Sequence, residues 1–345
     1  MFSRLVGNEN VKLTLRRLTA SGRMPNSMLL SGDEGVGKRQ FAIEIAKSFV
    51  CKDPVDGEAC DLCAACRRAD KFVFPKPDER EYHERIVFSE HPDVGMVIPY
   101  NRNILIKAIR HLESEANYRP YEAEARIFII DDADKMNDPA ANALLKTLEE
   151  PSPTTYIFLV TSRPDKLLPT IRSRCQSLRF SPITSEKIED FLINERAFTH
   201  DEARLAARLA RGSIGRAVTV NVEEFRKRRE KMMGAVTSAI QTGGFAALLK
   251  TAEELNEVKD KSAFEENLNV LQSIIHDVWT LSVTGDQARL VNTDFAGEIG
   301  HLAKNLGQAD LPGWMSLIDE VRENLKVNIN RKIAADALFV SMAGV

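Results

Sequence analysis

The sequence of 345 residues contains no long hydrophobic run. Crossing a bilayer as a helix takes about 20 consecutive apolar residues, and no stretch approaches that length. The first residues, Met1–Gly7, also lack an apolar core of the length that a secretory signal requires. We therefore expect no membrane association and a cytoplasmic location.

An excess of charge of either sign is also missing. The 47 Lys and Arg residues nearly balance the 50 Asp and Glu residues, for a net charge of −3. This balance argues against a strongly basic domain that holds nucleic acid alone through its phosphates. Hydrophobic residues make up 43% and charged residues 28%, which excludes disorder as the main state. Internal repeats and low-complexity segments are absent as well.

Cysteine is scarce, but four of the five cysteines cluster in the pattern Cys51-x8-Cys60-x2-Cys63-x2-Cys66. In a reducing compartment such a cluster favours a metal site over disulfides. Four sulfurs suit a closed, tetrahedral, structural Zn²⁺ site. An iron–sulfur cluster or four free thiols are the alternatives. A zinc finger that reads DNA is not indicated, because no basic helix adjoins the cluster.

Strand and helix patterns alternate in the first half of the chain. Residues 28–30, 126–131 and 156–161 contain apolar runs typical of buried strands, the second of which ends in the carboxylate of Asp131, and amphipathic stretches separate them. This alternation predicts a parallel sheet covered by helices on both faces. The polar segment 67–90, with prolines at 75 and 77, is interpreted as an excursion off this domain, and no function is assigned to it.

Helical periodicity dominates after about residue 182, where strand patterns nearly vanish. Thr199-x-x-Glu202 is a capping box that predicts the start of one such helix. We place domain edges near 180 and near 240. The prediction is a nucleotide-binding core over 1–180, a small helical domain over 181–240 and an all-helical domain over 241–345.

The stretch Gly32-x4-Gly37-Lys38 lies between a predicted strand and a predicted helix, which is the context of a phosphate-binding loop. Glycines at 32, 35 and 37 allow backbone N–H groups to converge on phosphate oxygens, and the helix N-terminus adds a favourable dipole. Lys38 is placed to reach the β- and γ-phosphates. A chance glycine-rich turn is the alternative interpretation.

The next residue changes the expected chemistry. The motif requires Ser or Thr after the lysine, because that hydroxyl ligates Mg²⁺, and this chain has Arg39. A guanidinium offers no lone pair to a cation. Asp131 ends a strand as a Walker B carboxylate does, but Asp132 stands where a longer Glu usually polarises the attacking water. The chain could therefore still bind nucleotide, but Mg²⁺ binding is disfavoured and hydrolysis is expected to be weak or absent. The alternative interpretation is that Asp131 and Asp132 are two solvated carboxylates without a role.

In order along the chain, these motifs resemble the clamp-loader ATPase subunits of bacterial DNA polymerase III, which belong to the AAA+ class. The resemblance covers about residues 4–220, whereas the last 100 or so match only in length and helical character. It implies an α/β AAA+ core whose parallel sheet is flanked by helices, a helical lid and an all-α collar. The motifs that carry it are the phosphate loop, the four-Cys insertion, His91-Pro92-Asp93, IKAIR at 106–110, DDADKM at 131–136, ANALLKTLEEP at 141–151 and IRSRC at 171–175.

The resemblance also implies residue roles. Arg174 matches the arginine finger of the Ser-Arg-Cys motif, which reaches the γ-phosphate held by a neighbouring subunit; a surface arginine is the alternative. Thr161 matches the first sensor position, with an ordinary strand residue as the alternative. Arg216 lies one position later than the second sensor of motor subunits. Val6 and Gly7 match the segment that lines the adenine pocket.

Within this family, gamma/tau motor subunits carry Ser or Thr after the lysine, whereas delta-prime subunits often have a degenerate loop. Arg39 and the short length favour the delta-prime group, with a gamma/tau-type motor that hydrolyses ATP as the alternative. The implied partners are gamma/tau and delta subunits, the sliding clamp and primer–template DNA. A helicase loader or an archaeal-type small subunit is disfavoured by the four cysteines and by Glu149-Glu150-Pro151.

Overall fold

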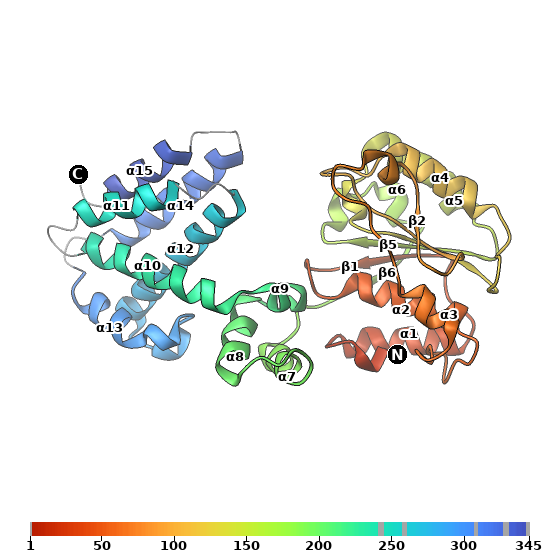
Figure 1. Cartoon of the computed structure of the whole chain (residues 1–345), viewed down its shortest axis with the longest axis horizontal. Coiled ribbons are helices and arrows are strands. Elements are labelled where there is room, and N and C mark those ends of the chain that lie inside the picture. The colour runs from red at the N-terminus through yellow and green to blue at the C-terminus, as the bar shows by residue number, and fades with distance from the viewer. Residues whose placement is uncertain (1, 241–244, 257–260, 307–309, 327–330, 343–345) are drawn as a thin grey trace. The chain divides into compact units, whose positions relative to one another are not determined.

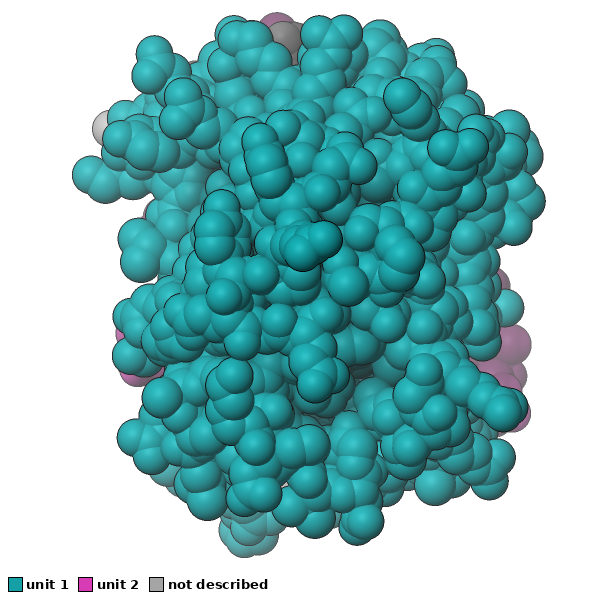
Figure 2. All heavy atoms as spheres, turned by 90° about the vertical axis from the view of Figure 1, so that its right-hand side faces the viewer, with its two compact units in different colours: residues 1–220 teal, residues 221–345 magenta. Residues whose placement is uncertain are grey.

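The computed structural model describes residues 2–240, 245–256, 261–306, 310–326 and 331–342 (Figure 1). The chain falls into two compact units, residues 1–220 and 221–345, which are coloured separately in Figure 2. The division into three domains with edges near 180 and 240 stays a prediction. Within the described ranges, no helix is long and apolar enough to span a membrane.

The first unit, described throughout residues 2–220, is built on a six-stranded sheet in the order β2-β3-β4-β5-β1-β6. The parallel sheet expected from the sequence is confirmed for β1, β3, β4, β5 and β6. Strand β2 adds an antiparallel edge beside β3. The strands are β1 (Ser27–Ser31), β2 (Val87–Phe88), β3 (Val94–Val97), β4 (Arg126–Ile130), β5 (Thr155–Thr161) and β6 (Gln176–Arg179).

The interpretation of 67–90 as an excursion off the domain is wrong for its last part. Val87 pairs with Met96 and Phe88 with Gly95, so the segment returns to the edge of the sheet. A two-residue strand is too short to produce a recognisable alternation in the sequence, which is why its pairing was not expected.

Helices cover both faces of the sheet, with α1 and α2 on one side and α4 and α5 on the other (Figure 1). Side chains of β4 explain why: Ile127 and Ile129 enter one core, whereas Phe128 and Ile130 enter the other. Because neighbouring residues of a strand point to opposite faces of the sheet, a continuous apolar run contributes side chains to the cores on both faces. The helices are α1 (Glu9–Ala20), α2 (Lys38–Val50), α3 (Ala64–Ala69), α4 (Ile106–Ala116), α5 (Asp138–Glu149) and α6 (Pro169–Arg172).

Three helices complete the first unit: α7 (Ser185–Arg196), α8 (His200–Leu209) and α9 (Ile214–Thr219). The predicted capping box begins α8, because the Glu202 N–H donates to Thr199 Oγ1 at 3.4 Å and the Thr199 N–H donates to Glu202 Oε2 at 3.0 Å. The expected change to helical structure after residue 182 is confirmed.

The described part of the second unit is helical, as expected, and has its own core. Leu271, Ile274 and Phe339 are fully buried there, and Met232 of α10 packs with them. Arg229 is also buried, paired with Asp294. The helices are α10 (Val222–Ile240), α11 (Phe245–Asn256), α12 (Lys261–Thr284), α13 (Ala296–Lys304), α14 (Leu311–Lys326) and α15 (Arg331–Met342).

Candidate nucleotide site and cysteine cluster

The phosphate loop lies at the carboxyl edge of the sheet. It connects β1 to α2, and the neighbouring parallel strands β4 and β5 end at the same edge. Ser31 pairs with Thr161, and Asp131 follows directly after β4. Ligands of open α/β sheets bind at this edge. The sheet therefore brings Lys38 and Arg39 to the same edge as Asp131 and Asp132.

Glycine is required at two positions of the loop by what lies against them. At Gly32 (φ +151°) an added Cβ would lie 2.5 Å from the Phe180 carbonyl oxygen. At Gly35 (φ +76°) it would lie 2.1 Å from Ser213 Oγ. Gly37 adopts the left-handed conformation at the N-cap of α2. The loop is thus enclosed by segments from later in the chain.

Lys38 is folded onto the loop itself. Its Nζ donates to the carbonyl oxygens of Gly32 at 2.8 Å and Asp33 at 2.6 Å, and the side chain is buried. Burial lowers the pKa of Lys38, while the carboxylates of Asp131 and Asp132 oppose that shift. A bound phosphate would exchange these two carbonyl contacts for stronger, charge-assisted ones.

Arg39 pairs with the Walker B carboxylate. Its Nη1 lies 3.2 Å from Asp131 Oδ2, and its guanidinium carbon lies 5.8 Å from the centre of the Phe74 ring. Burial raises the pKa of Asp131, and the charge of Arg39 counteracts that shift. Mg²⁺ does not fit these residues, because a guanidinium has no lone pair and the carboxylate already has a cationic partner.

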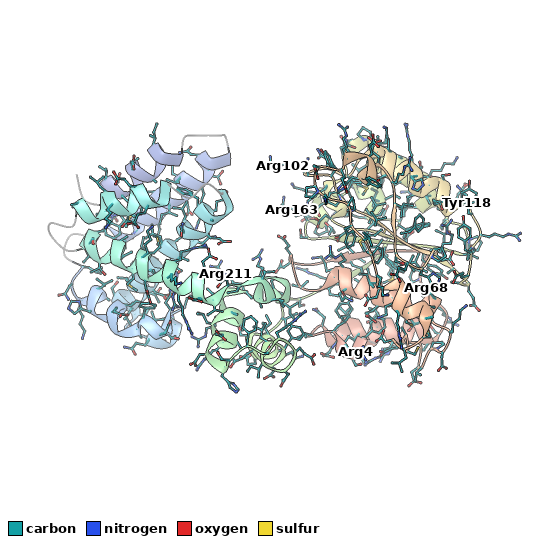
Figure 3. All side chains as sticks on the ribbon, viewed as in Figure 1. Arg4, Arg68, Arg102, Tyr118, Arg163 and Arg211 are labelled. Atoms are coloured by element: carbon teal, nitrogen blue, oxygen red, sulfur yellow. The ribbon has the colours of Figure 1, made fainter. Side chains whose placement is uncertain are left out.

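The other two residues at this edge are also paired within the chain. Asp132 adopts a left-handed conformation (φ +48°), and its carboxylate accepts from Lys135 Nζ at 2.8 Å. Thr161 is buried, donates to Asp134 Oδ1 at 2.6 Å and accepts from the N–H of Arg163 at 2.9 Å (Figure 3 labels Arg163). Asp134 is therefore part of this site, although no pattern in the sequence marked it as a site residue.

The predicted second sensor lies close to the loop, whereas the predicted adenine segment contacts the chain just after β6. Arg216 Nη2 is 3.8 Å from Glu34 Oε2, and the Gly215 N–H donates to the Gly35 carbonyl at 2.9 Å. Gly7 packs against Ile183, with an added Cβ 3.0 Å from that side chain, and half-buried Val6 precedes it.

Arg174 lies on the opposite face of the sheet from α2. It follows α6, next to Cys175, which is buried in the core beneath α4 and α5. Its Nη2 is 2.7 Å from Glu149 Oε1, and its Nη1 donates to the Thr170 carbonyl at 2.9 Å. The side chain remains partly exposed, so the structure does not unite it with the chain's own phosphate loop.

The four clustered cysteines converge. Cys51 follows α2, Cys63 caps the start of α3, and the four sulfur atoms of Cys51, Cys60, Cys63 and Cys66 all lie within 4.8 Å of one another. Burial opposes ionisation of Cys63, but N–H groups of Lys52 and Cys66 lower its pKa to about 6. Burial raises the pKa of Cys51 and Cys66. The closeness of the four sulfur atoms, rather than the pKa of one thiol, makes the cluster able to hold a metal ion such as zinc.

Charged contacts fasten the insertion that carries the cysteines. Lys47 of α2 and Arg4 both pair with Asp61, Arg4 at 3.5 Å. Arg68 of α3 forms a two-pronged contact with Glu122, and Figure 3 labels Arg4 and Arg68. These ion pairs therefore attach the insertion to neighbouring parts of the first unit.

A phosphate loop after β1 and a carboxylate after β4, on a mainly parallel sheet, place the protein in the P-loop class. The family described as "DNA polymerase III, delta subunit" matches residues 7–184, and the chain belongs to this family.

Relatives cover most of the chain. DNA polymerase III subunit delta' of Bacillus subtilis is 30% identical over 309 residues, 89% of this chain and 88% of the relative. The subunit of the same name from Escherichia coli is 26% identical over 324 residues, 93% of this chain and 89% of the relative. Among solved structures, a gamma subunit-related protein from Thermotoga maritima covers 96% of this chain and 98% of its own, with 19% identity and a TM-score of 0.44.

Proposed function

We propose that the chain is a delta-prime-type subunit of a DNA polymerase III clamp loader. In this role it assists ATP-dependent loading of the sliding clamp onto primed DNA, together with gamma/tau and delta subunits, in the cytoplasm. Membership of the delta-subunit family supports the proposal that the chain is part of a DNA polymerase III complex. The observation that favours an assembly subunit over a motor is Arg39, which occupies the place of the metal-binding hydroxyl and pairs with Asp131.

Each region of the chain has its own proposed role. Residues 1–180 are the AAA+ core, 181–240 the lid and 241–345 the collar that joins neighbouring subunits. The loop from Gly32 to Arg39, with Val6, Gly7, Thr161 and Arg216, is the nucleotide-binding region. Arg174 acts in trans, because its position across the sheet from the loop leaves it available to a neighbour.

Zinc is the metal we propose for the four cysteines. A set of four sulfur ligands leaves no position for a substrate water, so the site is structural. The four thiolates would hold together the loop between α2 and α3. DNA contact is proposed only within the assembled complex, since the chain's net charge of −3 does not favour binding alone.

Reconstitution tests this function. The purified chain is mixed with gamma/tau and delta subunits, and complex formation and clamp loading are measured with and without it. We expect a stable complex, loading that depends on the chain, and negligible hydrolysis by the isolated chain with Mg²⁺-ATP and primed DNA. Turnover of about 1 s⁻¹ would instead favour a gamma/tau-type motor, and failure to assemble would refute the proposal.

A further inference from the structure

Arg39 has two contacts with later segments of the chain. Its Nη1 lies 3.2 Å from Asp131 Oδ2, at the end of β4, and its guanidinium carbon lies 5.8 Å from the centre of the Phe74 ring. Phe74 itself stacks on Phe72, with ring centres 5.5 Å apart. Both aromatic residues belong to segment 67–90, so this segment reaches the phosphate loop and has a contact there.

The arrangement places a fixed positive charge where a metal ion would otherwise be needed. Asp131 is mostly buried, with 13% of its side chain exposed, and a buried carboxylate needs a cationic partner. Arg39 supplies that charge and keeps 55% of its side chain exposed, so donors remain for another anion. Its planar fork matches two phosphate oxygens.

We propose that Arg39 replaces Mg²⁺ at the phosphate loop, so that the chain binds a nucleoside di- or triphosphate without a divalent metal and does not hydrolyse it. The inference rests on the nucleotide-binding loop of the proposed function. Lys38 supplies the second positive charge from its position on the loop. Phe74 is a positioning residue, because its ring limits the directions that the exposed guanidinium can adopt.

Binding of a fluorescent ADP to the full-length chain, in EDTA and in Mg²⁺, tests the inference. For the unsubstituted chain we expect dissociation constants that agree within about twofold. Arg39→Gln should weaken binding in EDTA by about tenfold or more, through loss of a charge-assisted contact. Arg39→Thr restores the hydroxyl, so Mg²⁺ should now tighten binding by about tenfold or more. Arg17→Gln, an exposed arginine of α1, is the matched control and should change neither value.

Substitutions of Phe74 test its positioning role separately. Phe74→Ala should weaken binding in EDTA, and Phe74→Tyr, which keeps the ring, should restore it. Melting curves of each variant separate a lost contact from lost folding. If Phe74→Tyr binds as weakly as Phe74→Ala, the positioning role is wrong.

Three results would overturn the inference: tenfold tighter binding of the unsubstituted chain in Mg²⁺, no binding up to about 1 mM nucleotide, or unchanged binding by Arg39→Gln in EDTA. Assembly with gamma/tau and delta is measured on the same preparations. A chain that assembles but binds no nucleotide refutes only this inference, whereas a chain that fails to assemble refutes the proposed function.

Discussion

At the scale of single residues, the phosphate loop depends on side chains that enclose it. Gly35 adopts φ +76°, and an added Cβ would collide with Ser213 Oγ. Ser213 cannot easily move away, because its Oγ also accepts the Arg216 N–H and caps α9. The loop and the start of α9 therefore constrain each other.

Gly35→Ala is expected to lower the free energy of unfolding of the first unit by about 2–4 kcal/mol, combining left-handed strain with overpacking. Gly22→Ala is the control: Gly22 has φ +64° with nothing within 4 Å of an added Cβ, so it should show the strain alone. Adding Ser213→Ala to Gly35→Ala should recover part of the loss, as measured by denaturant titration. Equal losses at both glycines would disprove the steric explanation.

His91 makes stability depend on pH. It is fully buried, and its Nδ1 accepts from the Asp93 N–H at 3.2 Å, a bond that only the neutral ring can accept there. Burial lowers its pKa, although the charge of Asp93 opposes the shift. The unfolded chain therefore takes up the proton first, and the free energy of unfolding falls as pH drops below the ordinary value of about 6.5.

Melting temperatures between about pH 5.5 and 7, on either side of the ordinary histidine pKa, test this dependence. His91→Asn keeps an acceptor but cannot titrate, so its pH profile should be flatter than that of the unsubstituted chain. His200→Asn, at an exposed position of α8, should leave the slope unchanged. Parallel profiles for His91→Asn and the unsubstituted chain would show that another group is responsible.

At the scale of elements, the four-cysteine insertion has little core of its own. Its helix α3 has six residues, of which Ala65, Cys66 and Ala69 are buried. A helix this short is not stable by itself, so the insertion depends on contacts such as those of Asp61. A metal ion held by the four thiolates would add cross-links to these contacts. This dependence is the reason to expect a structural metal.

Cys63→Ser is expected to lose the metal and to destabilise the first unit. The unsubstituted chain, purified without added zinc, should contain close to one equivalent by metal analysis. The helices of the second unit should stay folded, because they share no ligand with the site. Cys175→Ala removes a thiol outside the cluster and should keep the metal. Intact thiols without metal under reducing conditions would contradict the zinc assignment.

At the scale of the whole molecule and its complex, Arg174 is the residue we expect to act outside the chain. Its guanidinium is partly exposed and pairs with Glu149 at 2.7 Å. Reaching a neighbour's γ-phosphate requires that this exposed pair exchange partners, which costs little because exposed ion pairs are weak. The pair is thus compatible with a role in trans.

Arg174→Ala should leave the chain folded and able to assemble, but slow hydrolysis at the one motor site that it faces. An arginine finger in trans is worth ~10³–10⁵ in rate, and Arg174→Lys should rescue little because it lacks the planar fork. The assay is a reconstituted complex in which only that site binds ATP. Arg172→Ala, at a nearby exposed arginine paired with Asp165, is the control and should have no effect. Unchanged hydrolysis with Arg174→Ala would disprove the finger assignment.

Patterns within short stretches were enough to predict much of this molecule. Apolar runs at 28–30, 126–130 and 156–161 became the central strands β1, β4 and β5. The phosphate loop and the four cysteines were also recognisable, because their chemistry depends on residue type and close spacing. The order in which strands follow helices likewise implied the parallel sheet.

Contacts between distant segments could not be predicted in the same way. The pairs Phe74–Arg39, Asp134–Thr161, Ser213–Gly35 and Glu149–Arg174 each depend on where packing places two segments, and so does the return of Val87–Phe88 to the sheet edge. The type of a side chain determines which groups it is able to bind. Its actual partner is the group that the folded chain brings within a few ångströms of it. Arg39 illustrates the difference: its presence excluded a metal-binding hydroxyl, but only the fold brought Asp131 and Phe74 into contact with it.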